Sequence, residues 1–135
     1  MTDQISLTVR DSVLYEPISD EQIMTLFFPK RTITARELIR ERVRREVEAY
    51  NDRLPEIFRG LIAPTEAERV LNGYRMPKKR TIDPERQCKL ACEAFEQNGF
   101  ILLVDDQQVA ALDETIEIRS NTSVEFLKLT PLVGG

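Results

Sequence analysis

Histidine and tryptophan are both absent from this sequence of 135 residues. Without histidine, the chain cannot form a Ser-His-Asp triad, a Cys-His dyad or a zinc site with imidazole ligands. Its longest wholly apolar run is far shorter than the roughly 20 residues that cross a bilayer, so we expect no transmembrane helix and no membrane partner. These absences favour a protein that is not itself an enzyme.

An excess of positive charge is also missing. The sequence has 19 lysines and arginines against 23 aspartates and glutamates, which gives a formal net charge of −4. A dedicated nucleic-acid binder needs a net basic face, so we expect no nucleic-acid partner. Residues 1–6 lack the basic start and apolar stretch of a signal peptide, which predicts a cytoplasmic protein.

Cysteine is scarce, and its two copies lie close together. Cys88 and Cys92 are spaced i,i+4 in an expected helix, so both side chains can lie on one face. As a metal pair they lack further ligands, and a disulfide would be unusual in a reducing cytosol. We expect two buried free thiols and no metal site.

Apolar periodicity predicts two strands near the N-terminus. Residues 5–9 alternate between apolar and polar side chains, as in a half-buried strand. Residues 13–15 are expected to continue the sheet beyond a turn at residues 11–12. Residues 23–28 are dense in apolar side chains and end before Pro29, so they predict a second strand.

The first clear helix is predicted to open at a capping box. The Thr34 side-chain oxygen would accept a hydrogen bond from a free backbone amide, and Glu37 would reach back to the cap. The helix should end at residues 51–54, before a proline. Arginines within residues 36–45 alternate with glutamates up to Glu46, which is typical of solvated ion pairing of small energetic worth.

Two further helices are expected along the chain. A second capping box at residues 65–68 predicts a short helix that Gly73 terminates. Asp83 as the cap and Pro84 at the first helical position predict another helix, which ends at residues 98–99.

The C-terminal part of the chain has the period of strands. Residues 100–104 are a continuous apolar run, typical of a strand buried on both faces, and residues 105–107 form a turn. Alternation at residues 116–119 predicts a short strand. After a turn at residues 121–123, residues 124–128 place alternate side chains on one face of a last strand. The expected plan is α+β, with helices packed on one face of a sheet.

The last six residues hold two of the five glycines. Glycine averages about 7% of residues, so a terminal pair arises by chance with a probability of roughly 0.5%. Residues 124–135, VEFLKLTPLVGG, resemble the final strand and tail of β-grasp proteins of the ubiquitin-like and sulfur-carrier group, including the carriers of thiamine and molybdopterin synthesis. Residues 102–109 resemble a strand–turn unit of that family, and residues 32–39 resemble the entry to its main helix.

The resemblance implies a β-grasp sheet with one main helix, in a single domain that spans residues 1–135. It covers roughly residues 1–53 and 100–135. Residues 54–99 depart from it and are interpreted as a helical insertion. Residues 130–135 are interpreted as a flexible C-terminal tail.

The resemblance also implies that the chain is a substrate of other enzymes. An E1-like enzyme would use ATP to adenylate the carboxylate of Gly135. An E2-like enzyme would then pass the chain to an amine of a target protein, from which a deconjugating protease would release it. No cofactor of the chain's own is implied, because ATP is used by the activating partner.

Each residue of the tail then has an implied role. Gly134 and Gly135 form the reactive end, because residues without a Cβ allow close backbone approach in a narrow channel. Pro131 stiffens the exit from the sheet, and Leu132 and Val133 give the partner an apolar grip.

Three alternatives stay open. A sulfur carrier would convert Gly135 to a thiocarboxylate after the same first step. A non-covalent ubiquitin-like interaction module would leave the tail inert. The tail could also be a terminal segment without a role.

Overall fold

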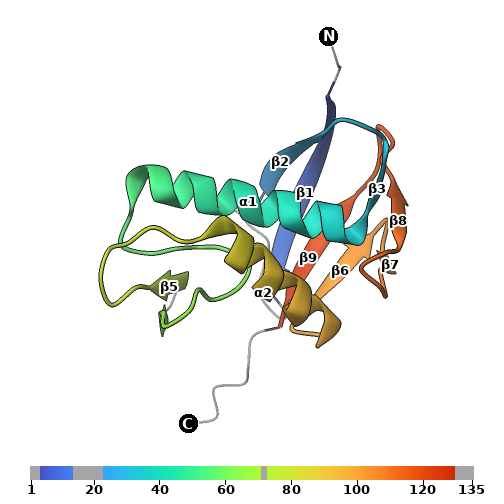
Figure 1. The fold of residues 1–135 in the computed structure, drawn as a ribbon. Helices are drawn as coiled ribbons and strands as arrows, with labels where there is room; N and C mark the ends of the chain where they lie inside the picture. Colours follow the sequence, from blue (N-terminus) through green and yellow to red (C-terminus); the bar gives the residue numbers. More distant parts are fainter. Residues whose placement is uncertain (1–3, 14–22, 71–72, 130–135) are drawn as a thin grey trace. The chain divides into compact units, whose positions relative to one another are not determined.

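The computed structural model describes residues 4–13, 23–70 and 73–129. The chain is α+β, as expected: it has a mixed sheet of five strands together with helices α1 (Ala35–Arg53) and α2 (Pro84–Glu96) (Figure 1). None of the helices in this described part is both long and apolar enough to cross a membrane.

The chain divides into two compact units. The sheet unit comprises residues 1–37 and 95–135, and the helical unit comprises residues 38–94. Each unit is described by itself below. The prediction of a single domain stays a prediction.

The sheet unit is built on five strands. In spatial order these are β2 (Ile23–Phe28), β1 (Ile5–Val13), β9 (Val124–Lys128), β6 (Phe100–Val104) and β7 (Gln107–Gln108). β1 and β9 are parallel, and the other three neighbouring pairs are antiparallel. The first and last strands of the described chain therefore lie side by side (Figure 1).

One face of this sheet is the core of the unit. Residues directly opposite each other share a face, so the pairing of Leu7 with Leu26 and of Leu102 with Phe126 places these side chains on the same side. All four are buried. The same face holds further buried residues: Val9, Phe28, Phe100 and Val124.

Two details of the strands differ from expectation. The turn predicted at residues 11–12 is wrong, because Asp11 and Val13 stay in register with Phe126 and Lys128 and β1 runs on through them. β6 is not buried on both faces. Phe100 and Leu102 are buried on the core face, whereas Ile101 and Leu103 on the other face are half-buried, as a strand of a mixed sheet can be. The part of the predicted continuation beyond Val13 lies outside the described residues.

A tight turn joins β6 to β7 where a turn is predicted. Asp105 and Asp106 have φ angles of 50° and 66°, the left-handed values that a type I′ hairpin turn requires at both central residues. A separate two-stranded sheet pairs β3 (Thr32–Thr34) with β8 (Thr115–Glu117). β8 overlaps the predicted strand at 116–119 only at residues 116–117, whereas β3 has no counterpart among the predictions.

Both helices begin at their predicted caps. The Glu37 amide donates to Thr34 Oγ1 at 3.1 Å, and Glu37 Oε1 accepts from the Thr34 amide at 3.4 Å, so the capping box is confirmed. α1 ends at Arg53, within the predicted range. At α2, Asp83 Oδ1 accepts from the Glu85 amide at 3.1 Å. The helix ends at Glu96, just before Asn98 takes a φ of 60°.

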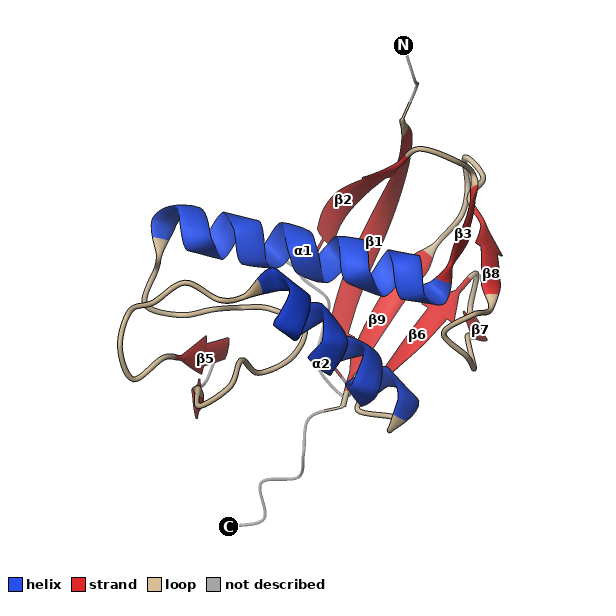
Figure 2. Cartoon of the chain, in the orientation of Figure 1, coloured by secondary structure: helices blue, strands red, loops and turns tan. Residues whose placement is uncertain are grey.

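The helix predicted from residue 65 to Gly73 is wrong. In its place, β4 (Glu68–Val70) pairs antiparallel with β5 (Gly73–Arg75). The reason is a turn: the Ala67 amide donates to the Pro64 carbonyl at 3.2 Å, and Glu66 has a φ of 66°, which a right-handed helix cannot contain. Between α1 and α2 the described chain thus has strands and loops (Figure 2).

Candidate functional site

The predicted reactive end and the residues expected to bind a partner lie outside the described residues: Gly134, Gly135, Pro131, Leu132 and Val133. The structure defines the strand that leads to them, β9, and the residues around that strand in the sheet unit. The candidate site is therefore built outward from β9.

β9 is held by hydrogen bonding on both sides. It pairs in parallel with residues 9–13 of β1 and antiparallel with β6. The rings of Phe126 and Phe100 lie with centroids 5.9 Å apart, and the Lys128 ammonium is 3.5 Å from the Asp11 carboxylate. β9 is therefore the middle strand of the five and is held by both neighbours as far as Lys128.

The second face of the same five strands is partly apolar and accessible. The register places Ile23 opposite Arg10, Arg10 opposite Glu125, and Glu125 opposite Leu103, so these residues share a face. Ile23 and Phe27 are 38% and 40% exposed. Three further apolar residues of this face are half-buried: Ile101, Leu103 and Leu127. These five apolar residues are termed the open face.

Polar residues lie among the apolar residues of the open face. Arg10 and Glu125 are opposite partners on β1 and β9, and Ser6, Thr8 and Thr25 are exposed on the same side of the sheet. Because β1 lies between β2 and β9, its polar residues separate the apolar residues of β2 from those of β9 and β6. The surfaces of protein–protein interfaces are similarly mixed, with about as much apolar area as the rest of a protein surface.

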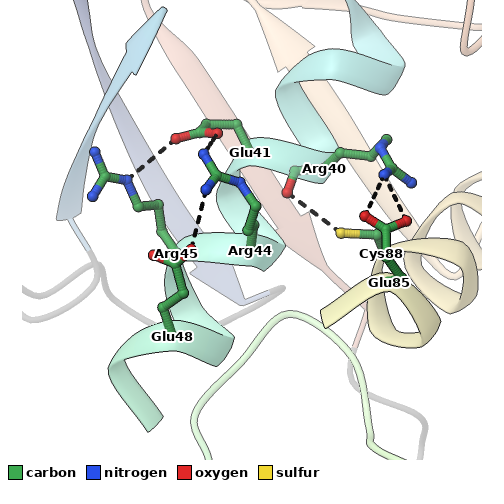
Figure 3. Close-up of polar contacts among 7 residues, drawn as sticks. All are labelled: Arg40, Glu41, Arg44, Arg45, Glu48, Glu85 and Cys88. Atoms are coloured by element: carbon green, nitrogen blue, oxygen red, sulfur yellow. Dashed lines mark hydrogen bonds and ion pairs between the residues drawn. The ribbon is translucent and has the colours of Figure 1, made fainter. Parts of the chain in front are cut away.

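The arginine-rich face of α1, in the helical unit, is paired with its own glutamates, as the sequence predicts. In Figure 3, Arg44 lies between Glu41 and Glu48, and Arg45 also reaches Glu41. The hydrogen bond to Glu41 raises the pKa of Arg44 above its ordinary value. Exposed pairs of this kind contribute about 0.3–0.5 kcal/mol each, so this face is a structural feature and no binding site follows from it.

One ion pair joins the two helices of this unit. Arg40 Nη2 on α1 lies 2.9 Å and 2.8 Å from the two carboxylate oxygens of Glu85 on α2 (Figure 3). This hydrogen bond is the main cause that raises the pKa of Arg40. The neighbouring Cys88 thiol donates to the Arg40 carbonyl at 3.5 Å.

Cys88 lacks the setting of a catalytic thiolate. Both cysteines are free thiols, as predicted; Cys88 is buried, but Cys92 is only half-buried. Burial is the main cause that raises the pKa of Cys88, which keeps the sulfur protonated at neutral pH. Cys88 is therefore a core residue of the helical unit.

The sequence does not predict that α1 contains a buried ion pair. The side chains of Arg42 and Glu46 are only 2% and 8% exposed, and Arg42 Nε donates to Glu46 Oε1. Glu46 Oε2 also accepts from the Leu61 amide at 3.0 Å. Glu46 was expected on the solvated face, which is wrong. The i,i+4 spacing shows the pair, but nothing in the sequence marks it as the buried one.

Gly60 lies close to the Glu46 carboxylate. A Cβ on Gly60 would lie 2.1 Å from Phe58 Cζ and 2.9 Å from Glu46 Oε2, so only glycine fits between them. The Phe58 ring in turn meets Tyr50 edge to face, with centroids 5.3 Å apart. Arg42, Glu46 and Gly60 together hold the loop after α1 and serve the fold of this unit.

Among the described residues, no group of three or more histidine, cysteine, aspartate or glutamate side chains could hold a metal ion. Comparison of the chain with protein-family models, with curated proteins and with solved structures finds no match in any of the three.

Proposed function

We propose that this chain is a ubiquitin-like protein of the β-grasp fold, whose Gly135 carboxylate is adenylated by an E1-like enzyme and conjugated to target proteins. The observation that carries the proposal is the place of β9. It is the middle strand of the sheet, parallel to β1, and the sequence that follows it ends in Gly134-Gly135.

The strand order supports the β-grasp assignment. In a β-grasp sheet, the first and last strands are parallel neighbours, and each has an antiparallel partner on its outer side. The order β2-β1-β9-β6-β7, with only the β1–β9 pair parallel, agrees with this arrangement. The capped helix that follows β3 directly agrees with the family's main helix.

The proposed chemistry uses the tail as an acyl donor. A carboxylate reacts poorly because its leaving group would be an oxide, and ATP removes this barrier by forming an acyl-adenylate with release of pyrophosphate. A thiolate of the enzyme then displaces AMP, and an amine of the target displaces the thiolate to leave an amide. The catalytic groups belong to the partners, and this chain supplies Gly135 and the surface that they recognise.

The open face is proposed as the docking surface for the activating enzyme. Leu127 of β9 belongs to it, Glu125 of β9 lies beside it, and β9 is the strand from which the chain continues toward Gly135. A partner that covers the open face would therefore bind the strand that directly precedes the tail in the sequence. Gripping residues close to the reacting group reduces the entropy lost when the terminus enters an active site.

Mass spectrometry of covalent adducts tests the proposal. The protein, tagged at its N-terminus, is incubated with an extract of the cells that encode it, with and without ATP. We expect ATP-dependent adducts in which a peptide ending in Gly135 is joined to a lysine or cysteine of another protein. The matched control lacks Gly134 and Gly135 and keeps every described residue; adducts formed equally by this variant contradict the proposal.

The same experiment distinguishes the sulfur carrier. A thiocarboxylate leaves the protein unconjugated but heavier by the difference between sulfur and oxygen, and ATP would be needed to form it. An ATP-independent complex that survives removal of Gly134 and Gly135 would instead identify a non-covalent interaction module.

A further inference from the structure

A turn in the helical unit presents Thr65 at its corner. The Ala67 amide donates to the Pro64 carbonyl at 3.2 Å, and Glu66 has a φ of 66°, which is the pattern of a type II turn with Thr65 as its second residue. Thr65 is exposed. Its hydroxyl therefore lies on the surface, on a short and well-defined piece of backbone.

Two arginines converge on this one residue, Arg80 before α2 and Arg86 in the first turn of α2. Arg86 Nε donates to Thr65 Oγ1 at 3.1 Å, and Arg80 Nη2 donates to the Thr65 carbonyl at 2.6 Å. Within the described ranges, neither guanidinium has a carboxylate at ion-pair distance. Both positive charges are thus held beside Thr65 without an anion.

The surrounding sequence adds positive charge. Residues 65–89 hold seven lysines and arginines and four acids, Glu66, Glu68, Asp83 and Glu85, although acids outnumber bases by 23 to 19 in the whole chain. Glu85 pairs with Arg40, and Asp83 caps α2. The stretch around Thr65 therefore keeps an excess of positive charge.

A phosphate group on Thr65 would supply the missing anion. It carries a charge of about −1.5 to −2 at neutral pH and three strong acceptor oxygens. A guanidinium matches such oxygens with two parallel donors, and hydrogen bonds between two charged groups are stronger than those between neutral ones. Arg86 already touches the oxygen that would carry the phosphate, and Arg80 lies on the same residue.

We propose that Thr65 is a phosphorylation site and that Arg80 and Arg86 of the same chain bind its phosphate. In the modification, a protein kinase transfers the terminal phosphoryl group of a nucleoside triphosphate to Thr65 Oγ1. The new O–P bond forms as the bond to the nucleoside diphosphate breaks, and the hydroxyl proton leaves to a base of the kinase. The phosphate then ties the turn at 64–67 to the start of α2 and neutralises part of the basic stretch.

The binding half of this proposal is tested with homogeneous protein that carries phosphothreonine at position 65, introduced during synthesis. Denaturant unfolding is compared for the phosphorylated and unmodified forms. We expect phosphorylation to lower the unfolding equilibrium constant about tenfold, as one added charge-assisted hydrogen bond would. In the Arg80→Gln/Arg86→Gln variant this effect disappears.

The matched control is Lys78→Gln/Lys79→Gln, which removes the same charge from the same stretch but no hydrogen bond to Thr65. It should keep the tenfold effect. Because each variant is compared with its own unmodified form, a general loss of stability does not obscure the result. An equal effect of phosphorylation with and without Arg80 and Arg86, or no effect in the natural sequence, overturns the proposal.

The modification half is tested by phosphopeptide mapping of the protein isolated from its own cells. We expect phosphate on Thr65, and its absence from that residue overturns the assignment. Neither measurement involves Gly135, so the outcome is independent of the proposed conjugation.

Discussion

Glu46 contributes to the stability of the helical unit through a buried carboxylate that has two partners. It accepts hydrogen bonds from the Arg42 guanidinium and from the Leu61 amide. Removing one member of a buried ion pair leaves the other charge without compensation, which is far more costly than losing an exposed pair. The two kinds of pair occur on the same helix, so they can be compared directly.

We predict that Glu46→Ala lowers the free energy of unfolding by about 3 kcal/mol or more. Glu48→Ala removes an exposed partner of Arg44 from the same helix and should cost less than about 0.5 kcal/mol. Urea unfolding of the three proteins measures both values. Similar losses for the two variants would show that the Arg42–Glu46 pair is not the buried anchor described above.

Cys88 gives the stability a pH dependence at alkaline pH. Burial raises the pKa of its thiol, so the folded state keeps the proton longer than the unfolded state does. Below about pH 8.5, the thiol is protonated in both states, and its full contribution to the free energy of unfolding is present. Above that pH the unfolded thiol ionises first, and the free energy of unfolding falls as the pH rises toward the folded pKa.

We therefore predict a decrease in the free energy of unfolding between pH 8 and pH 10, with a slope of at most about 1.4 kcal/mol per pH unit from this group. Cys88→Ala, though less stable overall, should show a flatter profile over this interval. Tyr74, whose pKa burial also raises, acts at higher pH than the cysteine. Parallel profiles for the two proteins would exclude Cys88 as the cause.

At the scale of elements, helix starts were predictable because their signals are local. The Thr34–Glu37 box and the Asp83-Pro84 start each require only residues within one turn, and both caps are present. The box at residues 65–68 has the same Thr-x-x-Glu pattern as the first, yet it forms a turn and a hairpin. What distinguishes it is the pairing of Tyr74 with Phe58, whose backbones exchange hydrogen bonds across a long sequence separation.

Thr34→Ala tests the value of the first cap. The variant loses the bond from the Glu37 amide to Thr34 Oγ1, and we expect a loss of about 1 kcal/mol in the free energy of unfolding. Thr34→Ser keeps the hydroxyl and should stay close to the natural protein. Equal destabilisation by both variants would point to the lost methyl group and against the cap.

The β6–β7 turn offers a stabilising change. Asp106 has a φ of 66°, a conformation that costs residues with a Cβ about 1 kcal/mol and glycine almost nothing. Asp106→Gly should raise the free energy of unfolding by up to about 1 kcal/mol, as measured by thermal and urea unfolding. Asp113→Gly, at an exposed aspartate whose φ is not positive, serves as the control and should not stabilise the protein.

At the scale of the whole molecule, the alternating strands were predictable but their order was not. Residues 5–9 and 124–128 each show their buried face in sequence, since the side-chain period of a strand is two. Their parallel pairing depends on chain segments more than 100 residues apart, which no local pattern encodes. The open face has the same origin: its five apolar residues come from three strands and only the register brings them together.

The proposed docking role of the open face has its own test. Ile23→Ala/Phe27→Ala removes the two exposed apolar side chains of the open face, and we expect ATP-dependent adduct formation to fall about tenfold or more. Thr8→Ala/Thr25→Ala changes polar residues of the same face and should have little effect. Unchanged adduct formation by the first variant, with both proteins folded, would place the docking surface elsewhere.

The central claim, that Gly135 is a reactive acyl end, is tested most directly on the protein from its own cells. The peptide that contains residues 129–135 is isolated and its C-terminus identified by tandem mass spectrometry. The account predicts a fraction in which the Gly135 carbonyl is joined through an amide to a lysine of another protein. Gly135 found only as a free carboxylate, or followed by further residues in every molecule, would contradict it.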